Sequence, residues 1–185
     1  METHDFFDPV FWENSDSFFQ KYNNQKKLII KLLEEISNEF PVKKQRESIP
    51  GSKGNKIFQG YNLKGRPYQV LDMVRLFDRG DGINIRVLHW VGKGLYIFLY
   101  LGKNPASTKF WDEHEYFPLK MIFNGKTSFD YPFILKNSQS IKGNILELKD
   151  REYVVLWEKI PIRTNFKHNL DNINSMIQTI LDYTH

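Results

Sequence analysis

Three polar residues interrupt apolar runs in the middle of the sequence, and their types could support acid–base chemistry. Asp72, His89 and Tyr96 each lie in a stretch rich in Val, Ile, Leu and Phe, which is typical of a buried β-strand in which a charged group needs a partner. A carboxylate beside an imidazole raises the imidazole pKa and fixes its tautomer, as a general base requires. Asp72 and His89 are therefore our candidate catalytic residues. The alternative is a buried hydrogen-bond network that only satisfies the three polar groups.

Two turns decide whether these residues meet, because turn length sets the register of a hairpin. If residues 79–82 form a four-residue loop, Asp72 lies opposite His89. If residues 92–93, Gly-Lys, form a two-residue turn of the type II′ composition, His89 lies opposite Tyr96. We therefore predict one polar row that crosses three adjacent strands.

The same registers place Arg75 opposite Arg86 on the other face of the sheet. Two arginines directly opposite each other repel unless a carboxylate or a bound anion lies between them, so salt bridges and an anion-binding site both remain open. Tyr96, Phe98 and Tyr100 are part of an aromatic surplus that one layer of helices need not cover. These five residues are our candidate ligand-binding residues, and the alternative is that the aromatic side chains are simply core.

The strands that must position these residues begin after residue 56, where the period of the apolar pattern changes from that of a helix to that of a strand. The connections are too short for the crossover between parallel strands, which excludes a doubly wound nucleotide-binding fold for this part. We predict an antiparallel sheet of about six strands, with long loops over 103–140. The predicted strand segments are Lys56–Leu63, Pro67–Asp78, Ile83–Val91, Leu95–Leu101, a short one around Leu119–Phe123, Asn144–Lys149 and Glu152–Ile160.

Helical periodicity marks both ends of the sequence. Residues 8–9, Asp-Pro, are typical of a helix start, and an asparagine at 23–24 can cap a second helix that ends at Pro41. Residues 164–165, Thr-Asn, can cap a C-terminal helix with an apolar stripe that would cover the sheet. The pattern predicts an α+β fold with an N-terminal helix pair and a C-terminal helix packed on one face.

The order of helices, hairpins and a final long helix resembles the helix-grip layout, in which a bent sheet wraps a C-terminal helix and leaves an apolar cavity. This resemblance concerns the fold alone. We predict one domain over 1–185. Its parts are a helix pair over 1–40, a basic connector over 41–56, the sheet with its loops over 57–160 and the C-terminal helix over 165–184.

The whole net charge of +4 comes from the predicted connector, 41–56. This segment holds five Lys and Arg residues against Glu47, together with Pro, Gly, Ser and Asn, so it reads as an exposed linker with solvated cations. The alternative is contact with a nucleic acid or an anionic surface. Because the remainder of the chain is neutral, such a contact would be weak and salt-sensitive.

Composition excludes several kinds of chemistry. The sequence has no Cys, so thiol nucleophiles, disulfides and thiolate metal sites are excluded. Residues 51–56 lack the spacing of a phosphate-binding loop, and the acidic cluster at 112–115 reads as a solvated loop, so we predict neither a metal site nor a cofactor. The longest clean apolar run is Leu95–Leu101, and the acidic, aromatic start is not a signal peptide. We expect a cytoplasmic protein without a membrane partner.

Three functional hypotheses follow from these residues. The first is a non-catalytic binding module that holds a small apolar or aromatic ligand, or a protein segment, against the sheet. The second is an enzyme in which Asp72 and His89 act as acid and base while Arg75 or Arg86 binds an anionic substrate. The third is weak nucleic-acid binding through the connector, although the signature of the common RNA-binding sheet is absent.

Overall fold

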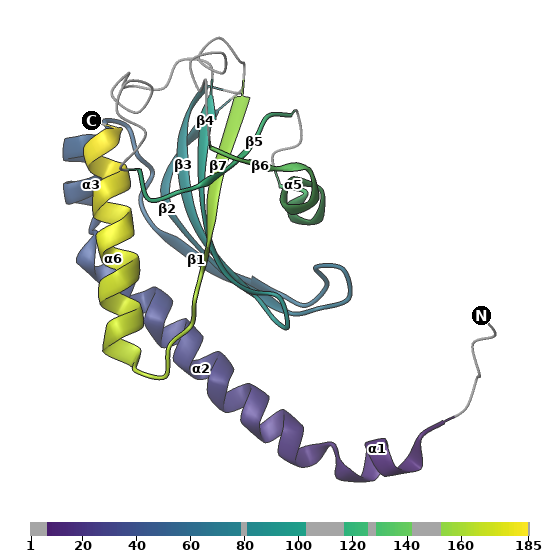
Figure 1. Cartoon of the computed structure of the whole chain (residues 1–185). Helices are drawn as coiled ribbons and strands as arrows, with labels where there is room; N and C mark the ends of the chain where they lie inside the picture. The colour runs from purple at the N-terminus through teal and green to yellow at the C-terminus, as the bar shows by residue number, and fades with distance from the viewer. Residues whose placement is uncertain (1–6, 79–80, 103–116, 126–128, 142–152, 185) are drawn as a thin grey trace.

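The chain folds around a seven-stranded antiparallel sheet (Figure 1). The computed structural model describes residues 7–78, 81–102, 117–125, 129–141 and 153–184. The strand order is β1-β2-β3-β4-β7-β5-β6, so the first four strands form consecutive hairpins and β7 pairs with β4. The strands are β1 (Lys56–Gly60), β2 (Tyr68–Asp78), β3 (Asp81–Trp90), β4 (Gly94–Gly102), β5 (Met121–Phe123), β6 (Gln139–Ser140) and β7 (Tyr153–Ile160).

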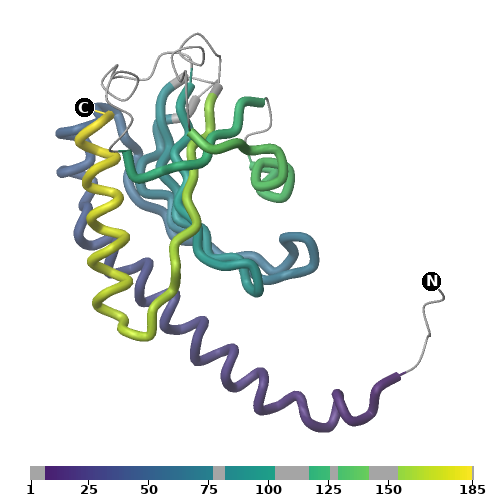
Figure 2. Tube along the Cα trace, in the orientation of Figure 1, coloured from purple at the N-terminus to yellow at the C-terminus, as the bar shows by residue number. Residues whose placement is uncertain are grey.

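Two long helices lie side by side against one face of the sheet, and a short helix lies against the other (Figure 1, Figure 2). The long helices are α2 and α6, and the short one is α5. The prediction of an α+β fold with helices at both ends is confirmed, and the described residues form seven strands where about six were expected. The helices in the described residues are α1 (Pro9–Asn14), α2 (Asp16–Glu39), α3 (Val42–Ser48), α5 (Tyr131–Asn137) and α6 (Phe166–Tyr183).

The face of the sheet beneath α2 and α6 is aliphatic. Successive residues of a strand point to opposite faces, so alternate Ile, Leu and Val residues of each strand meet the apolar stripes of the two helices. We call this the aliphatic face; its strand residues are Leu71, Met73, Val74, Ile83, Ile85, Val87, Leu95, Ile97, Leu99, Leu101, Ile122, Val154, Leu156 and Ile160.

The opposite face is rich in aromatic residues. The alternate positions of the same strands carry Tyr, Phe and Trp side chains that pack against Tyr131 and Ile134 of α5. We call this the aromatic face; its buried strand residues are Val70, Leu88, Trp90, Tyr96, Phe98, Tyr100, Phe123, Val155 and Trp157.

A β-bulge in β2 adjusts which of its side chains reach the core. The register with β3 shifts between Asp72 and Val74, and the adjacent residues Met73 and Val74 both pack in the aliphatic cluster. With strict alternation, Val74 would turn to the aromatic face and Arg75 to the aliphatic core. The bulge therefore keeps a charged side chain out of the aliphatic core.

Helix α2 starts earlier than the sequence predicts. It runs from Asp16 to Glu39, and the asparagines at 23–24, expected to cap it, lie inside it and are exposed. An asparagine inside a helix costs less than about 1 kcal/mol, so a residue type that favours caps need not begin a helix. The predicted N-terminal pair is therefore the short α1 followed by one long α2.

Helix α5 was not expected, because it lies in the range predicted to be long loops with one short strand. Asp130 Oδ1 accepts a hydrogen bond from the backbone N–H of Phe133 at 3.2 Å, and Pro132 lies in the first turn. This pattern is typical of a helix start and is the signal that identifies α5. The predicted strand segment 144–149 lies outside the described residues.

The segment 41–56 is packed more closely than a plain linker. It contains α3, in which Gln45 is fully buried, donates to the carbonyl of Phe40 at 2.7 Å and accepts from Ser52 Oγ at 3.1 Å. A buried amide with several partners holds the chain locally in place. The basic side chains of the segment are exposed, as expected, and their contact with a nucleic acid stays a prediction.

Candidate functional site

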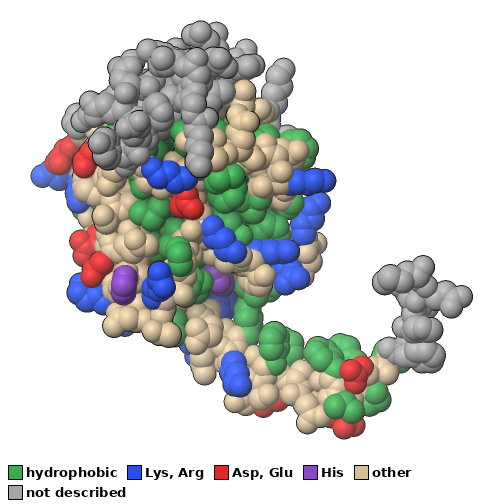
Figure 3. All heavy atoms as spheres, viewed as in Figure 1, with side chains coloured by type: hydrophobic (Ala, Val, Ile, Leu, Met, Phe, Trp, Pro, Cys, Tyr) green, Lys and Arg blue, Asp and Glu red, His purple; other side chains and the backbone are tan. Residues whose placement is uncertain are grey.

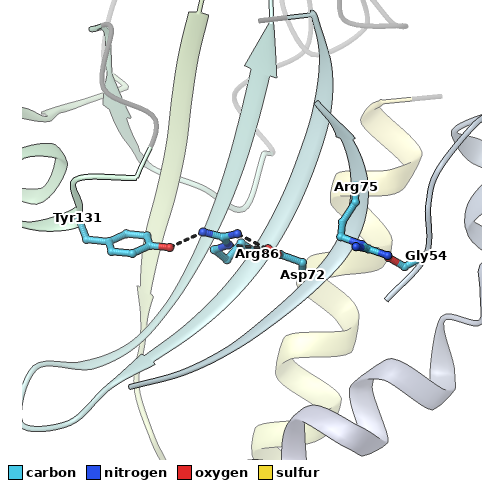
Figure 4. Close-up of polar contacts among 5 residues, drawn as sticks. All are labelled: Gly54, Asp72, Arg75, Arg86 and Tyr131. Atoms are coloured by element: carbon cyan, nitrogen blue, oxygen red, sulfur yellow. Dashed lines mark hydrogen bonds and ion pairs between the residues drawn. The ribbon is translucent and has the colours of Figure 1, made fainter. Parts of the chain in front are cut away.

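A buried ion pair between β2 and β3 lies on the aromatic face (Figure 4). Arg86 of β3 lies directly opposite Asp72 of β2 and binds its carboxylate with two hydrogen bonds, from Nε to Oδ1 at 2.5 Å and from Nη2 to Oδ2 at 2.7 Å. A third donor, Nη1, reaches the hydroxyl of Tyr131 at 2.5 Å. Asp72 and Arg86 are only 6% and 8% exposed, so this bidentate pair is shielded from water.

Aromatic rings and charges around the pair keep the guanidinium charged. The Arg86 guanidinium carbon lies 4.5 Å from the centre of the Phe129 ring and 5.6 Å from that of Phe58. Burial acts to lower the pKa of Arg86, but the hydrogen bond that it donates to Asp72 and the nearby charges outweigh burial, and the pKa is raised. Burial raises the pKa of Tyr131. The charged groups of this network are therefore hydrogen-bonded to each other within the protein.

Arg75 does not face Arg86, contrary to the predicted register. It pairs with Asn84 in the sheet, and its side chain donates from Nε to the carbonyl of Gly54 at 2.8 Å and from Nη2 to that of Lys53 at 3.0 Å (Figure 4). Arg75 therefore ties β2 to the loop between α3 and β1. The sequence left open whether a protein carboxylate or a bound anion balances the arginines. For Arg86 it is a protein carboxylate, that of Asp72.

The predicted row of Asp72, His89 and Tyr96 is wrong. His89 lies opposite Gln69 in β2 and Leu95 in β4, on the opposite face of the sheet from Asp72 and Tyr96. Two turn lengths and the bulge in β2 are the causes. Asp78 pairs with Asp81, which leaves two residues between these strands instead of four, and the bulge shifts the register by one residue more, so Asp72 lies opposite Arg86. Trp90 pairs with Gly94, which leaves three residues instead of two and places His89 opposite Leu95.

His89 has a different partner from the one expected. Its Nδ1 lies 2.7 Å from Gln69 Oε1, and burial lowers its pKa to about 4. The ring is therefore neutral near pH 7, and a neutral imidazole donates from Nδ1 to the amide oxygen. A carboxylate beside His89 would have raised its pKa, so the acid–base hypothesis has lost the contact on which it depended.

The candidate ligand-binding aromatic residues are covered by the protein itself. Phe98 and Tyr100 are fully buried, and Tyr96 is 5% exposed. The Phe98 ring packs against Tyr100, Tyr131 and Trp157, with centroids 5.3 to 6.3 Å apart. The Tyr96 hydroxyl donates to the carbonyl of Lys93 at 3.1 Å. Core packing accounts for these contacts.

A pocket of about 420 Å³ lies on the other side of the molecule, between α2 and α6. Ile29 and Leu32 of α2 and Leu95 of β4 give it an apolar floor, while the rim carries polar groups. We call this the α2–α6 pocket; its lining residues are Gln25, Leu28, Ile29, Leu32, Leu95, Ile162, Arg163, Thr164, Phe166 and Asn169.

The loop that forms one wall of the α2–α6 pocket is held by Asn169. Its side chain accepts from the backbone N–H of Arg163 and donates to the carbonyl of the same residue, both at 2.8 Å. Asn165 caps α6 by accepting from the N–H of His168 at 3.0 Å. The wall is therefore formed before any ligand binds. A smaller pocket of about 160 Å³ shares Arg163 and Asn169 with it and is also lined by Pro161, His168 and Asn172.

Sequence reasoning missed this pocket because its lining comes from three parts of the chain that meet only after folding. Each apolar residue in it fits an ordinary core stripe, so no local pattern marks it. The available signal was Ile162, an apolar residue that follows the last strand and is 52% exposed in the structure. Such a residue between two elements indicates an apolar surface in the loop.

No protein-family model, curated protein or solved structure matches this chain. None of the helices that the structure describes is long and apolar enough to cross a lipid bilayer. The described part of the chain also holds no group of three or more His, Asp and Glu side chains that could bind a metal ion, and residues 112–115 lie outside it. The function must therefore be inferred from the geometry of the chain's own residues.

Proposed function

We propose that this chain is a non-catalytic binding module that holds a small apolar or aromatic ligand in the α2–α6 pocket. The observation that carries the proposal is the pocket itself. Its volume, about 420 Å³, is in the range of small-molecule sites, and it combines an apolar floor with a few polar groups at the rim.

The rim indicates the chemistry of the ligand. Arg163 is exposed and borders both the α2–α6 pocket and the smaller polar pocket beside it. A guanidinium at this position favours a ligand that carries a carboxylate, sulfonate or similar group next to its apolar part. The ligand therefore differs from the one expected at the aromatic face, although the class of protein remains a binding module.

Anilinonaphthalene sulfonate, an aromatic anion that fluoresces in apolar surroundings, is a suitable probe. We expect saturable binding of one probe per chain. Thr164→Phe fills the pocket from its rim and should weaken binding at least about tenfold, and Arg163→Gln should weaken it about threefold, because the contact is exposed to solvent.

Two variants serve as matched controls. Ser175→Phe adds the same ring to an exposed position of α6 outside the pocket. Lys43→Gln removes a cation from an exposed position of α3. Both should bind the probe like the unmodified chain. Probe binding that is equally strong in Thr164→Phe and in Ser175→Phe would contradict the proposal.

A further inference from the structure

The N-terminal helices form an arm that projects from the body of the molecule (Figure 1, Figure 3). The arm, Phe7–Leu28, comprises α1 and the first half of α2, and none of its side chains is buried, although Gln25 and Leu28 at its base also line the α2–α6 pocket. Trp12 is 67% exposed and Phe18 is 60% exposed. A single exposed aromatic residue is ordinary on a protein surface, but a row of several is unusual. The large apolar side chains exposed along the arm are Phe7, Val10, Phe11, Trp12, Phe18, Phe19 and Leu28.

The apolar side of the arm continues the stripe by which α2 packs on the sheet. Phe18 and Tyr22 precede Ile29, Leu32 and Ile36 at spacings of three, four and seven residues, which place all five on one side of a helix. The last three are buried against the aliphatic face, whereas Phe18 lies beyond the body and is exposed. The apolar stripe therefore extends beyond the part of α2 that the body of the chain covers, so another surface is needed to bury it.

Charges divide the arm into an acidic and a basic part. Residues 7–20 contain three acids, Asp8, Glu13 and Asp16, and no Lys or Arg. Residues 21–33 contain four lysines and no acid. A parallel pairing of two such arms would place like charges together, whereas an antiparallel pairing would place the acidic part of each arm beside the basic part of the other.

We propose that the arm binds the arm of a second copy of this chain. The two arms pair antiparallel around a two-fold axis near Phe18 and Phe19. This inference goes beyond the proposed ligand pocket and does not depend on it. In such a pairing Phe18 of one arm lies level with Phe19 of the other, and Asp16 lies level with Lys21. The two-fold symmetry repeats each contact.

The exposed area suffices for a dimer of moderate strength. If the five exposed aromatic side chains of each arm each bury about 100 Å² more, about half the area that an aromatic residue buries in full, the pair buries about 1,000 Å². This value is at the lower limit for specific interfaces, so we expect a dissociation constant in the micromolar range.

Sedimentation equilibrium of the full chain at several micromolar concentrations tests the proposal. The chain should sediment as a reversible dimer, and Phe18→Ser combined with Phe19→Ser should weaken dimerisation at least about tenfold. Both side chains are exposed in one copy, so circular dichroism should show an unchanged fold. Phe133→Ser, which removes a similarly exposed ring from α5, is the matched control and should dimerise normally.

A charge exchange tests the antiparallel register. Asp16→Lys alone and Lys21→Asp alone each create two like-charge contacts across the axis and should each weaken dimerisation about fivefold. Both substitutions in one chain restore opposite charges at both contacts and should restore most of the affinity. A parallel pairing would not give this recovery, because it places residue 16 level with residue 16 of the other arm, and like charges remain there after the exchange.

Three results would overturn the inference. The first is a chain that stays monomeric throughout the micromolar range, whether or not it binds lipid vesicles. The second is a dimer that the Phe18 and Phe19 substitutions leave intact. The third is a double charge exchange that dimerises no better than the single ones. None of them bears on probe binding in the α2–α6 pocket, which is measured separately.

Discussion

The aliphatic face of the sheet and the aromatic face bury side chains in different ways. Long helices with Ile and Leu stripes cover the aliphatic face, and the two charged residues that are buried in the described part of the chain both lie on the other face. The aromatic face lies under the short α5 and holds the ion pair of Asp72 and Arg86. The aliphatic face therefore buries mainly uncharged side chains, with the hydrogen bond between His89 and Gln69 among them, whereas the aromatic face also buries an ion pair.

The polar ends of the aromatic side chains explain this difference. A buried Tyr or Trp needs a hydrogen-bond partner for its O–H or N–H group. Trp90 Nε1 donates to the carbonyl of Leu63 at 3.0 Å, and Trp157 Nε1 donates to Ser138 Oγ at 2.7 Å. Large rings thus fill the aromatic face although α5 is short. Each buried Tyr or Trp ring, however, adds an O–H or N–H group that needs a hydrogen-bond partner.

The largest expected effect lies in the ion pair of the aromatic face. Arg86→Met leaves the Asp72 carboxylate buried without its partner, and we expect it to lower the free energy of unfolding by about 3–5 kcal/mol. Urea unfolding followed by tryptophan fluorescence measures this. Arg75→Met, which loses only contacts to backbone carbonyls, should cost about 1–2 kcal/mol.

A double variant separates the cost of an unpaired buried charge from the cost of changed side-chain packing. Asp72→Leu combined with Arg86→Met removes both charges, so most of the stability lost in Arg86→Met should return. If the double variant is as unstable as the single one, the aromatic face does not depend on satisfying a buried charge, and the contrast between the two faces fails.

For Ile97, on the aliphatic face, the expected effect depends on the volume removed. Ile97 is fully buried there, and Ile97→Ala should lower the free energy of unfolding by about 3 kcal/mol through lost burial and a cavity. Ile97→Val removes one methylene and should cost about 1 kcal/mol. The same urea measurement applies, and a loss that does not grow with the volume removed would contradict a packing explanation.

His89, on the aliphatic side of β3, should make stability depend on pH. Its pKa in the folded chain is about 4, below the ordinary value near 6.5, so the unfolded chain takes up the proton first as the pH falls. Its contribution to the free energy of unfolding, about 3 kcal/mol, is present above pH 6.5 and is lost as the pH falls towards 4.

Two histidine variants isolate this contribution. His89→Gln should unfold with a weaker pH dependence between about pH 6.5 and 4 than the unmodified chain. His168→Gln changes an exposed residue at the start of α6 and should retain the full dependence. Identical pH profiles for the two variants would show that His89 is not held neutral in the fold.

The smallest predicted effect concerns one hydroxyl on the aromatic face. Ser138 Oγ accepts from Trp157 Nε1 at 2.7 Å and donates to the carbonyl of Ile134 at 2.6 Å, so it links the end of α5 to β7. Ser138→Ala leaves the indole N–H without this partner and should cost about 1 kcal/mol in the urea measurement. Asn137→Ala, whose side chain bonds only to its own helix in an exposed position, should cost less.

The sequence predicts the elements well where a periodic pattern is long. The C-terminal helix begins at its predicted cap, Asn165, and Asp8 caps α1 as expected. The apolar runs predict β3 and β4 to within two residues of their observed bounds. Such patterns are local consequences of which side of an element meets the core, so they can be read without knowing what the element packs against.

The contacts between elements could not be predicted in the same way. Asp72 is correctly predicted to need a partner, but its partner is Arg86 instead of His89 because the turn after Asp78 is two residues shorter than expected and the bulge shifts the register by one residue more. A difference of one residue in a turn moves a side chain to the other face. The bulge at Met73 adds a second shift, and nothing in the apolar run distinguishes it from an unbroken strand.

Helix α2 is one continuous element in two environments. Its 24 residues span about 36 Å, and only its second half is packed against the sheet. Backbone amides of residues 29–39 exchange their hydrogens with solvent only when the body opens, whereas those near residue 20 exchange whenever the free end frays. The helix thus carries a gradient of local stability along its length, and amide exchange would locate the residue at which the packed body ends.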